Sequence, residues 1–180
     1  MRYAESLRII NKISSGRSIV GLDFGCGYHG QFVRMANRIL NVQFYGFDLA
    51  VSPNRKELLA GDIAVLREAN IRPEVVTLHA VLEHLESPVE LLDFLLQLMS
   101  DDAVLMLTVP SKTAKPVLEF LAYRLGVIAR SEIEDHKCYY DRASLMELLR
   151  GRFERVEHRY FQWGFNNRIT AYRKAKKSDE

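Results

Sequence analysis

At 180 residues the chain has the length of one globular domain, and its 48% hydrophobic and 27% charged residues exclude a disordered polypeptide. The formal net charge of +2 is too small to predict nucleic-acid binding through a basic surface. The two cysteines are too few for a disulfide framework, and neither a signal peptide nor the ~20 apolar residues of a transmembrane segment is present, so we expect one cytoplasmic domain over residues 1–180.

Helix and strand patterns alternate along the chain. Apolar residues recur at helical spacing over residues 3–13, 31–40, 88–99, 114–125 and 141–151. Short apolar runs predict strands at 18–25, 42–48, 57–63, 74–81, 102–110, 153–161 and 166–174. Strands that alternate with helices form a mostly parallel sheet, so we predict an α/β fold.

Two helices carry clear end signals. Ser87 stands at an N-cap position with Pro88 after it, and Glu90 is placed to complete a capping box. Asp141 is the expected cap of the later helix, and Gly151 is its expected C-terminal glycine.

The stretch "LDFGCGYHG", residues 22–30, follows the first predicted strand. Gly25, Gly27 and Gly30 fit the G-x-G-x-x-G spacing of dinucleotide sites, which indicates an NAD(P)-dependent oxidoreductase. Asp23 argues against that ligand, because at ~5 Å and an effective dielectric near 20 a carboxylate opposes a phosphate charge by roughly 3 kcal/mol. The same charge favours the cationic S-adenosylmethionine.

Acidic side chains and one histidine also follow the neighbouring strands. Asp48 is placed to accept hydrogen bonds from ribose hydroxyls, which both ligands contain. Asp62 can accept from the adenine amine while Ile63 packs on the ring, although Asp62 also suits a simple turn. Because ligands bind at the carboxyl ends of parallel strands, we expect Asp23, Asp48, Asp62 and His79 to share one cleft.

The motifs "VGLDFGCGYHG", "YGFDLA", "AGDI" and "TLHAVLEHLESP", in this order, resemble the class I S-adenosylmethionine-dependent methyltransferases. The resemblance is strongest to the broad bacterial group with small substrates. It implies a Rossmann-like, mostly parallel seven-stranded sheet with helices on both faces and an antiparallel final strand. It further implies S-adenosylmethionine as cofactor, S-adenosylhomocysteine as product, and a small-molecule or cell-envelope glycan or lipid-precursor acceptor rather than nucleic acid.

The resemblance assigns the cofactor contacts by position. Asp23, Gly25 and Gly27 would line the methionine part, Asp48 the ribose, and Asp62 with Ile63 the adenine. His79 and Leu82 would close over the cofactor, and the expected set also includes Cys26, Tyr28 and Leu49. Residues 1–13 would form a lid helix.

Two departures from the family pattern bear on this site. His29 replaces the usual third glycine, and three roles stay open for it: facing solvent, approaching the cofactor carboxylate, or pointing toward the acceptor. The short interval from Asp48 to Asp62 predicts that the intervening helix is reduced to a turn or two.

Catalysis of methyl transfer rests largely on orientation, with a base only where the acceptor must lose a proton. In "EDHKCYY", His136 is the candidate base, and Tyr139 or Tyr140 is placed to shape the substrate pocket; the alternative is that Asp135 and His136 cap a turn while one tyrosine packs inward. His84 either borders the cleft or lies on the surface.

Residues 111–140 are the expected substrate-side insertion. No set of histidines and cysteines completes a tetrahedral metal site, so we expect no metal. Because no base is assured by the sequence, a non-catalytic partner protein that binds S-adenosylmethionine remains an alternative.

Overall fold

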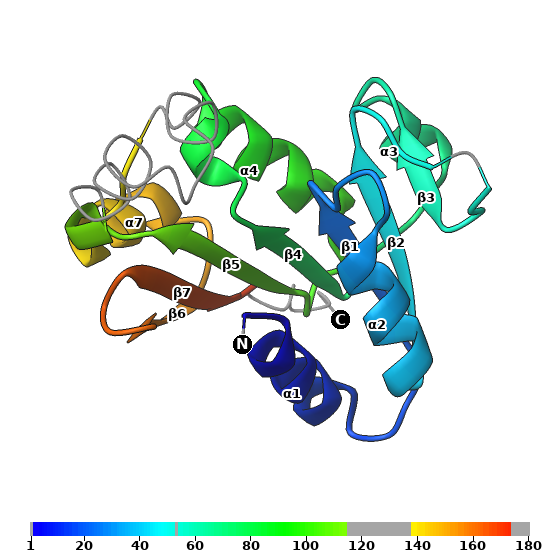
Figure 1. Cartoon of the computed structure of the whole chain (residues 1–180), viewed down its shortest axis with the longest axis horizontal. Helices are drawn as coiled ribbons and strands as arrows, with labels where there is room; N and C mark the ends of the chain where they lie inside the picture. The colour runs from blue at the N-terminus through cyan, green and yellow to red at the C-terminus, as the bar shows by residue number, and fades with distance from the viewer. Residues whose placement is uncertain (1, 53, 115–137, 174–180) are drawn as a thin grey trace, which may run out of the picture.

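The protein is described by a computed structural model covering residues 2–52, 54–114 and 138–173 (Figure 1). Its centre is a seven-stranded sheet with the order β3-β2-β1-β4-β5-β7-β6. The strands are β1 Ile19–Phe24, β2 Val42–Asp48, β3 Leu58–Ala60, β4 Val75–His79, β5 Val104–Pro110, β6 Arg155–Phe161 and β7 Asn166–Tyr172. Only β7 is antiparallel to its neighbours, β5 and β6. The predicted α/β fold, including the antiparallel last strand, is confirmed.

Helices cover both faces of the sheet (Figure 1). Helices α1 (Arg2–Ser14) and α2 (Gln31–Ile39) pack on one face, and α4 (Pro88–Leu98), α7 (Arg142–Leu149) and the short α3 (Val65–Glu68) pack on the other. Short 3-10 helices, η1 (Leu82–His84) and η2 (Lys112–Ala114), follow β4 and β5. The predicted reduction of the helix between β2 and β3 to a turn or two goes further in the structure, because the described part of that interval has bends and turns and no helix. None of the described helices is long and apolar enough to cross a membrane.

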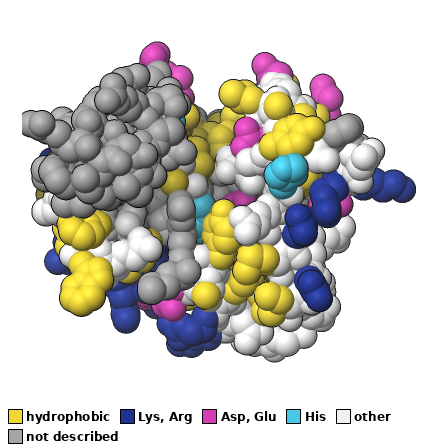
Figure 2. All heavy atoms as spheres, in the orientation of Figure 1, with side chains coloured by type: hydrophobic (Ala, Val, Ile, Leu, Met, Phe, Trp, Pro, Cys, Tyr) yellow, Lys and Arg dark blue, Asp and Glu magenta, His cyan; other side chains and the backbone are white. Residues whose placement is uncertain are grey.

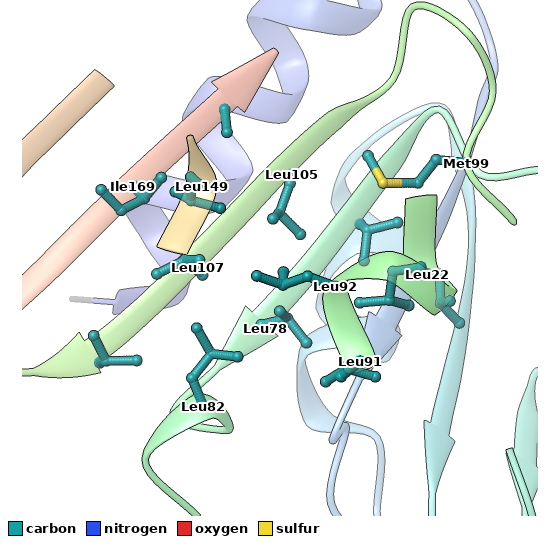
Figure 3. Packing of buried hydrophobic residues seen from close by; sticks show 14 of the residues in the cluster. Leu22, Leu78, Leu82, Leu91, Leu92, Met99, Leu105, Leu107, Leu149 and Ile169 are labelled. Carbon is teal, nitrogen blue, oxygen red and sulfur yellow. The ribbon is translucent and has the colours of Figure 1, made fainter. Parts of the chain in front are cut away.

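Alternation along the strands divides the core into two layers. On the α4 side, Leu92 and Leu149 meet strand side chains such as Leu78, Leu105 and Leu107 (Figure 3). On the α1 side, aromatic and aliphatic side chains of α1, α2 and β2 pack together, among them Ile10, Phe32 and Phe44. Successive strand residues point to opposite faces, so two adjacent residues of one strand belong to different layers. This parity decides on which side of the sheet a side chain within a strand lies.

A glycine permits close packing on the α1 side. A Cβ at Gly21 of β1 would lie 2.2 Å from the ring of Phe44 in the adjacent strand. The bare backbone of β1 therefore lets the Phe44 ring lie flat across the sheet.

Of the two predicted sets of helix-end signals, the one at Asp141 and Gly151 is confirmed and the capping box at Ser87 is not. The Asp141 carboxylate accepts from the Ser144 amide at 2.8 Å in a complete capping box, and Gly151 has a φ of +73°. The capping box predicted at Ser87 is wrong, because Ser87 has φ −122° and ψ 71° and its side chain makes no cap hydrogen bond. Its ψ lies outside the extended range typical of an N-cap. The helix predicted over 114–125 falls almost wholly outside the described residues.

Candidate functional site

A pocket of about 770 Å³ opens at the carboxyl ends of β1, β2, β3 and β4 and is walled on one side by α4. Its size lies within the range of small-molecule sites. Aromatic side chains of Phe24, Phe47 and Phe94 supply apolar walls. Figure 2 shows that this face of the molecule is hollowed, with hydrophobic and acidic side chains gathered along the hollow.

The pocket contains six of the residues expected from the sequence. They share a position at the end of a strand or in the segment that follows it: Gly25, Asp48, Leu49, Asp62, Ile63 and His84. Parallel strands end at one edge of the sheet, which is why residues far apart in the chain meet there. For His84, the structure selects the cleft over the open surface.

Asp48 joins the end of β2 to the glycine turn after β1. Its Oδ2 accepts the Gly27 amide at 2.8 Å, and its Oδ1 accepts the Leu49 amide at 2.8 Å. A carboxylate offers about four acceptor positions, so each oxygen keeps capacity for one donor from a ligand. Asp48 thus fixes the turn and still presents acceptors at the pocket.

The amides of the glycine turn are largely used within the protein. Gly25 and Cys26 both donate to the carbonyl oxygen of Phe47, at 2.8 and 3.1 Å, and Gly27 donates to Asp48. A pyrophosphate cradle relies on backbone N–H groups that point at the ligand. These three consecutive amides point into the protein instead.

Charge at the pocket is negative. Asp48, Asp62, Glu86 and Glu90 line it, and among the described lining residues there is neither lysine nor arginine. A cleft with one sign of charge attracts ligands of the opposite sign. The pocket therefore suits a ligand with cationic and hydroxyl or amine donor groups.

The turn itself depends on two glycines with positive φ. Gly25 has φ +75°, and a Cβ there would lie 2.5 Å from Cγ2 of Val81. Gly27 has a similar φ of +71°, but a Cβ there would meet no atom within 4 Å. The backbone at Gly27 consequently faces open space.

This contrast gives a paired prediction. Gly25→Ala is expected to weaken ligand binding at the pocket and to lower the thermal midpoint more than Gly27→Ala does. Both variants carry the strain of a non-glycine residue at positive φ, of order 1 kcal/mol, whereas only Gly25→Ala also clashes with Val81. Thermal denaturation and ligand calorimetry on both variants measure the difference. Equal effects of the two changes would contradict the packing assigned to Gly25.

Asp23 and His79 lie on the opposite face of the sheet, under α1. The Asp23 carboxylate accepts the Thr77 hydroxyl at 2.6 Å and faces Nδ1 of His79 at 3.2 Å, while Nε2 of His79 lies 3.0 Å from the Ser6 hydroxyl. All four side chains are buried. Of the four residues expected to share one cleft, the pocket lining includes Asp48 and Asp62 but neither Asp23 nor His79, so the predicted cofactor contacts of those two stay predictions.

Ser6 also belongs to this hydrogen-bonded network, and its role there was not predicted from the sequence. It lies between Tyr3 and Ile10 on the buried stripe of α1, and a polar residue on such a stripe was the available signal. Ser6 is 2% exposed, so its hydroxyl is not presented to a substrate as a nucleophile. The hydrogen bonds from Ser6 through His79 to Asp23 attach α1 to the sheet.

Glu5 makes a second attachment of α1 to the sheet. Its carboxylate pairs with Arg8 at 2.9 Å and with Arg168 of β7 at 2.5 Å. The hydrogen bond from Arg8, together with Arg168, lowers the pKa of Glu5 from 4.5 to about 2. A depressed carboxyl pKa stabilises the fold above the unfolded value and loses that contribution as the pH falls toward the folded value.

We therefore expect stability to fall between about pH 4.5 and about pH 2 through Glu5. Glu5→Gln should flatten this part of the stability profile, and chemical denaturation at pH 5 and pH 3 measures it. Glu57→Gln, which removes a carboxyl from the half-buried ion pair with Arg55, is the matched control. An unchanged profile in Glu5→Gln would contradict the pairing.

The remaining predicted residues have other surroundings. Cys26 is buried, and this burial, with the charges of Asp23 and Asp48, raises the pKa of its thiol to about 12. Tyr28 is exposed and lies edge-on to the exposed His29 ring, which matches the solvent-facing alternative for His29.

On the acceptor side, Tyr140 donates its hydroxyl to the carbonyl of the buried Leu82 at 3.2 Å. Burial raises the pKa of Tyr140 to about 12. This is the inward-packing tyrosine of the alternative left open by the sequence. Tyr139 is half-buried, and His136 lies outside the described residues.

Comparison with known proteins adds a family and a fold. A family model described as "Methyltransferase domain" matches residues 2–152. No curated relative matches the chain in sequence. Among solved structures, the chain is similar to a magnesium protoporphyrin IX methyltransferase from Synechocystis PCC 6803 with bound SAH, at a TM-score of 0.65 and 15% identity over 96% of this chain and 82% of that chain.

Two further solved structures have the same architecture. The plantazolicin methyltransferase BpumL, in complex with a triazolic desmethylPZN analogue and SAH, matches at a TM-score of 0.71 and 15% identity over 96% of this chain and 83% of that one. A SAM-dependent methyltransferase from Archaeoglobus fulgidus matches at a TM-score of 0.67 and 15% identity over 95% of this chain and 94% of that chain.

Proposed function

The chain belongs to the methyltransferase domain family, and from that premise we propose that it transfers the methyl group of S-adenosylmethionine to a small-molecule or cell-envelope glycan or lipid-precursor acceptor. The alternative of an NAD(P)-dependent oxidoreductase rested on the spacing of Gly25, Gly27 and Gly30. Family membership favours the methyl donor over the dinucleotide.

One observation supports the choice of ligand most strongly: the glycine turn opens onto an acidic pocket while its own amides are occupied. Gly25, Cys26 and Gly27 donate within the protein, and four acidic residues line the pocket. A pyrophosphate would meet carboxylates where it needs N–H donors. An adenosyl group offers hydroxyl and amine donors to those carboxylates.

Individual residues have assignable roles toward this ligand. Asp48 would accept from the ribose hydroxyls, and Asp62 with Ile63 would hold the adenine amine and ring against the apolar wall. S-adenosylmethionine, when bound, supplies a methyl group activated by a sulfonium charge. The open space beside Gly27 would accommodate the methionine portion. The third glycine, Gly30, begins α2 with φ 53°, and a Cβ there would lie 2.5 Å from Leu58; its role is packing.

Of the candidate catalytic residues, His84 lines the pocket within the described residues, and we assign it the role of a base. An imidazole accepts a proton near neutral pH, which suits an acceptor hydroxyl that must be deprotonated. His136 and Tyr139 stay candidates on the acceptor side. Two structural neighbours are named for a porphyrin and for plantazolicin, which supports a small-molecule acceptor for this chain as well.

Transfer from S-adenosylmethionine with a labelled methyl group tests the acceptor class. The label is expected in the small-molecule or lipid-linked fraction of a cell extract incubated with the wild-type protein, and its incorporation should fall sharply with the Asp48→Ala variant. Label that appears only in nucleic acid or protein would contradict the proposed acceptor, and equal incorporation by wild type and Asp48→Ala would contradict the proposed site.

A further inference from the structure

A second pocket, of about 330 Å³, lies on the α1 face of the sheet, near the β6–β7 turn. Its walls come from α1, β5, β6 and β7, and none of its described lining residues belongs to the acidic pocket. Three of them decide its chemistry: Thr108, Arg159 and Arg168.

These three side chains form a row across neighbouring strands. Thr108 of β5 is in register with Arg168 of β7, and Arg168 is in register with Arg159 of β6. Directly opposite residues of an antiparallel pair stand on the same face with Cβ atoms about 5 Å apart. The sheet therefore presents one hydroxyl and two guanidinium groups side by side.

The hydroxyl of Thr108 is the unusual member of the row. Thr108 is 4% exposed, and its Oγ1 is buried without a hydrogen-bond partner among the described residues. A buried polar atom normally has a hydrogen-bond partner, because burying it without one costs free energy. An acceptor atom entering the pocket would remove that cost.

The two arginines have donors to spare. Arg168 uses one Nη toward Glu5, and Arg159 has no ion pair within the described ranges. Each guanidinium carries five N–H donors. Glu5 also lines the pocket, and its carboxylate pairs with both Arg8 and Arg168. The positive charge of the arginines at this pocket therefore exceeds the negative charge of Glu5. The field here is opposite in sign to that of the acidic pocket.

We propose that this pocket is an oxyanion site, which binds a carboxylate or phosphate group of the methyl acceptor through Arg159, Arg168 and the hydroxyl of Thr108. Arginine binds both groups through paired N–H donors, and carboxylate and phosphate share this chemistry. The assignment of the ligand to the acceptor rests on the proposed function. The acceptor class is thereby narrowed to molecules with an anionic group.

The test uses inorganic phosphate and acetate as probes. Each is titrated at constant ionic strength into the full-length protein, and backbone amide NMR follows the residues of the pocket. Saturable shifts are expected at Thr108, Arg159 and Arg168. Arg159→Gln and Arg168→Gln should each weaken binding about tenfold, since a charge-assisted hydrogen bond contributes that much or more. Arg150→Gln removes an exposed arginine whose ion pair among the described residues is with Glu147, and it should leave the affinity unchanged.

Thr108→Val separates a ligand-binding hydroxyl from a structural one. Because the valine removes an unsatisfied buried oxygen, the thermal midpoint without phosphate should rise, and the further rise produced by phosphate should shrink. A midpoint that falls, or an unchanged response to phosphate, would show that the hydroxyl has a structural role and would count against the site.

Other outcomes would overturn the proposal. The absence of saturable shifts with both probes, or equal weakening by Arg150→Gln and Arg159→Gln, would show that the pocket is not a specific site. Calorimetry with S-adenosylhomocysteine on the same samples keeps the two proposals apart. Phosphate binding without S-adenosylhomocysteine binding would remove the assignment to the acceptor, whereas the reverse would remove the oxyanion site and leave the proposed function intact.

Discussion

Replacing Asp48 with alanine is expected to weaken S-adenosylhomocysteine binding by about 100-fold, because the two ribose hydrogen bonds that we propose for its carboxylate would be lost and each bond to a charged acceptor contributes at least about 1.5 kcal/mol. The change also removes the acceptors of the Gly27 and Leu49 amides, so the glycine turn loses its attachment to β2. Isothermal titration calorimetry measures the affinity, and circular dichroism shows whether the fold persists.

Two further variants sharpen this result. Asp62→Ala should weaken binding less, since its carboxylate is assigned a single adenine amine and already caps the turn through the Ala64 amide at 2.8 Å. Asp102→Ala, in the exposed turn before β5, is the matched control for loss of a carboxylate outside the pocket. An Asp48→Ala variant that remains folded and binds S-adenosylhomocysteine like the wild type would show that this strand end does not hold the ribose.

Replacing Asp23 with alanine is expected to lower the free energy of unfolding by about 3 kcal/mol, because two buried polar groups lose their partner and each such group left unsatisfied costs about 1–3 kcal/mol. The Thr77 hydroxyl and the His79 ring would lose their common acceptor at the centre of the sheet. Because His79 also contacts Ser6, the attachment of α1 should loosen. Chemical denaturation measures the stability, and hydrogen exchange measures the protection of α1.

Asp23→Asn tests the charge of this residue apart from its hydrogen bonds. The amide oxygen can still accept from Thr77, so the stability should fall less than in Asp23→Ala. Only S-adenosylmethionine carries a sulfonium charge, so the variant should lose more affinity for S-adenosylmethionine than for S-adenosylhomocysteine. A native stability of Asp23→Ala would contradict the buried chain, and equal losses for the two ligands in Asp23→Asn would contradict the charge argument.

The order of the helices and strands could be predicted because the residues within and beside each element favour that type of element. The strand over 42–48 matches β2 at both ends, since "VQFYGFD" combines strand-forming residues with a terminal aspartate. The helix after Asp141 follows from a cap and a terminal glycine. Ser87 shows the limit of such signals, because a favourable residue at the right position does not fix the backbone angles of a cap.

The candidate site was predictable at strand ends but not across the two faces of the sheet. Asp48 is the last residue of β2 and Asp62 follows β3, and both line the pocket at this edge of the sheet. Asp23 is the next-to-last residue of β1 and His79 is the last residue of β4, yet both side chains are buried under α1, on the side of the sheet that Ile19 and Val75 share. A position near a strand end therefore does not by itself bring a side chain into the pocket. The adjacent Phe24 and Ala80 line the pocket instead.

Contacts between segments far apart in the sequence could not be predicted from local sequence patterns. The Ser6–His79 bond joins α1 to β4, and the Thr108–Arg168–Arg159 row requires the register of three strands. Glycine spacing alone was ambiguous for a similar reason. The ligand preference of "LDFGCGYHG" depends on where its amides donate, which only the folded turn determines.

Calorimetry of the wild-type protein with S-adenosylhomocysteine and with NADH, side by side in one buffer, tests the central claim most directly. The acidic pocket and the occupied turn amides predict saturable binding of S-adenosylhomocysteine and no measurable binding of NADH. Saturable binding of NADH without a response to S-adenosylhomocysteine would contradict the account.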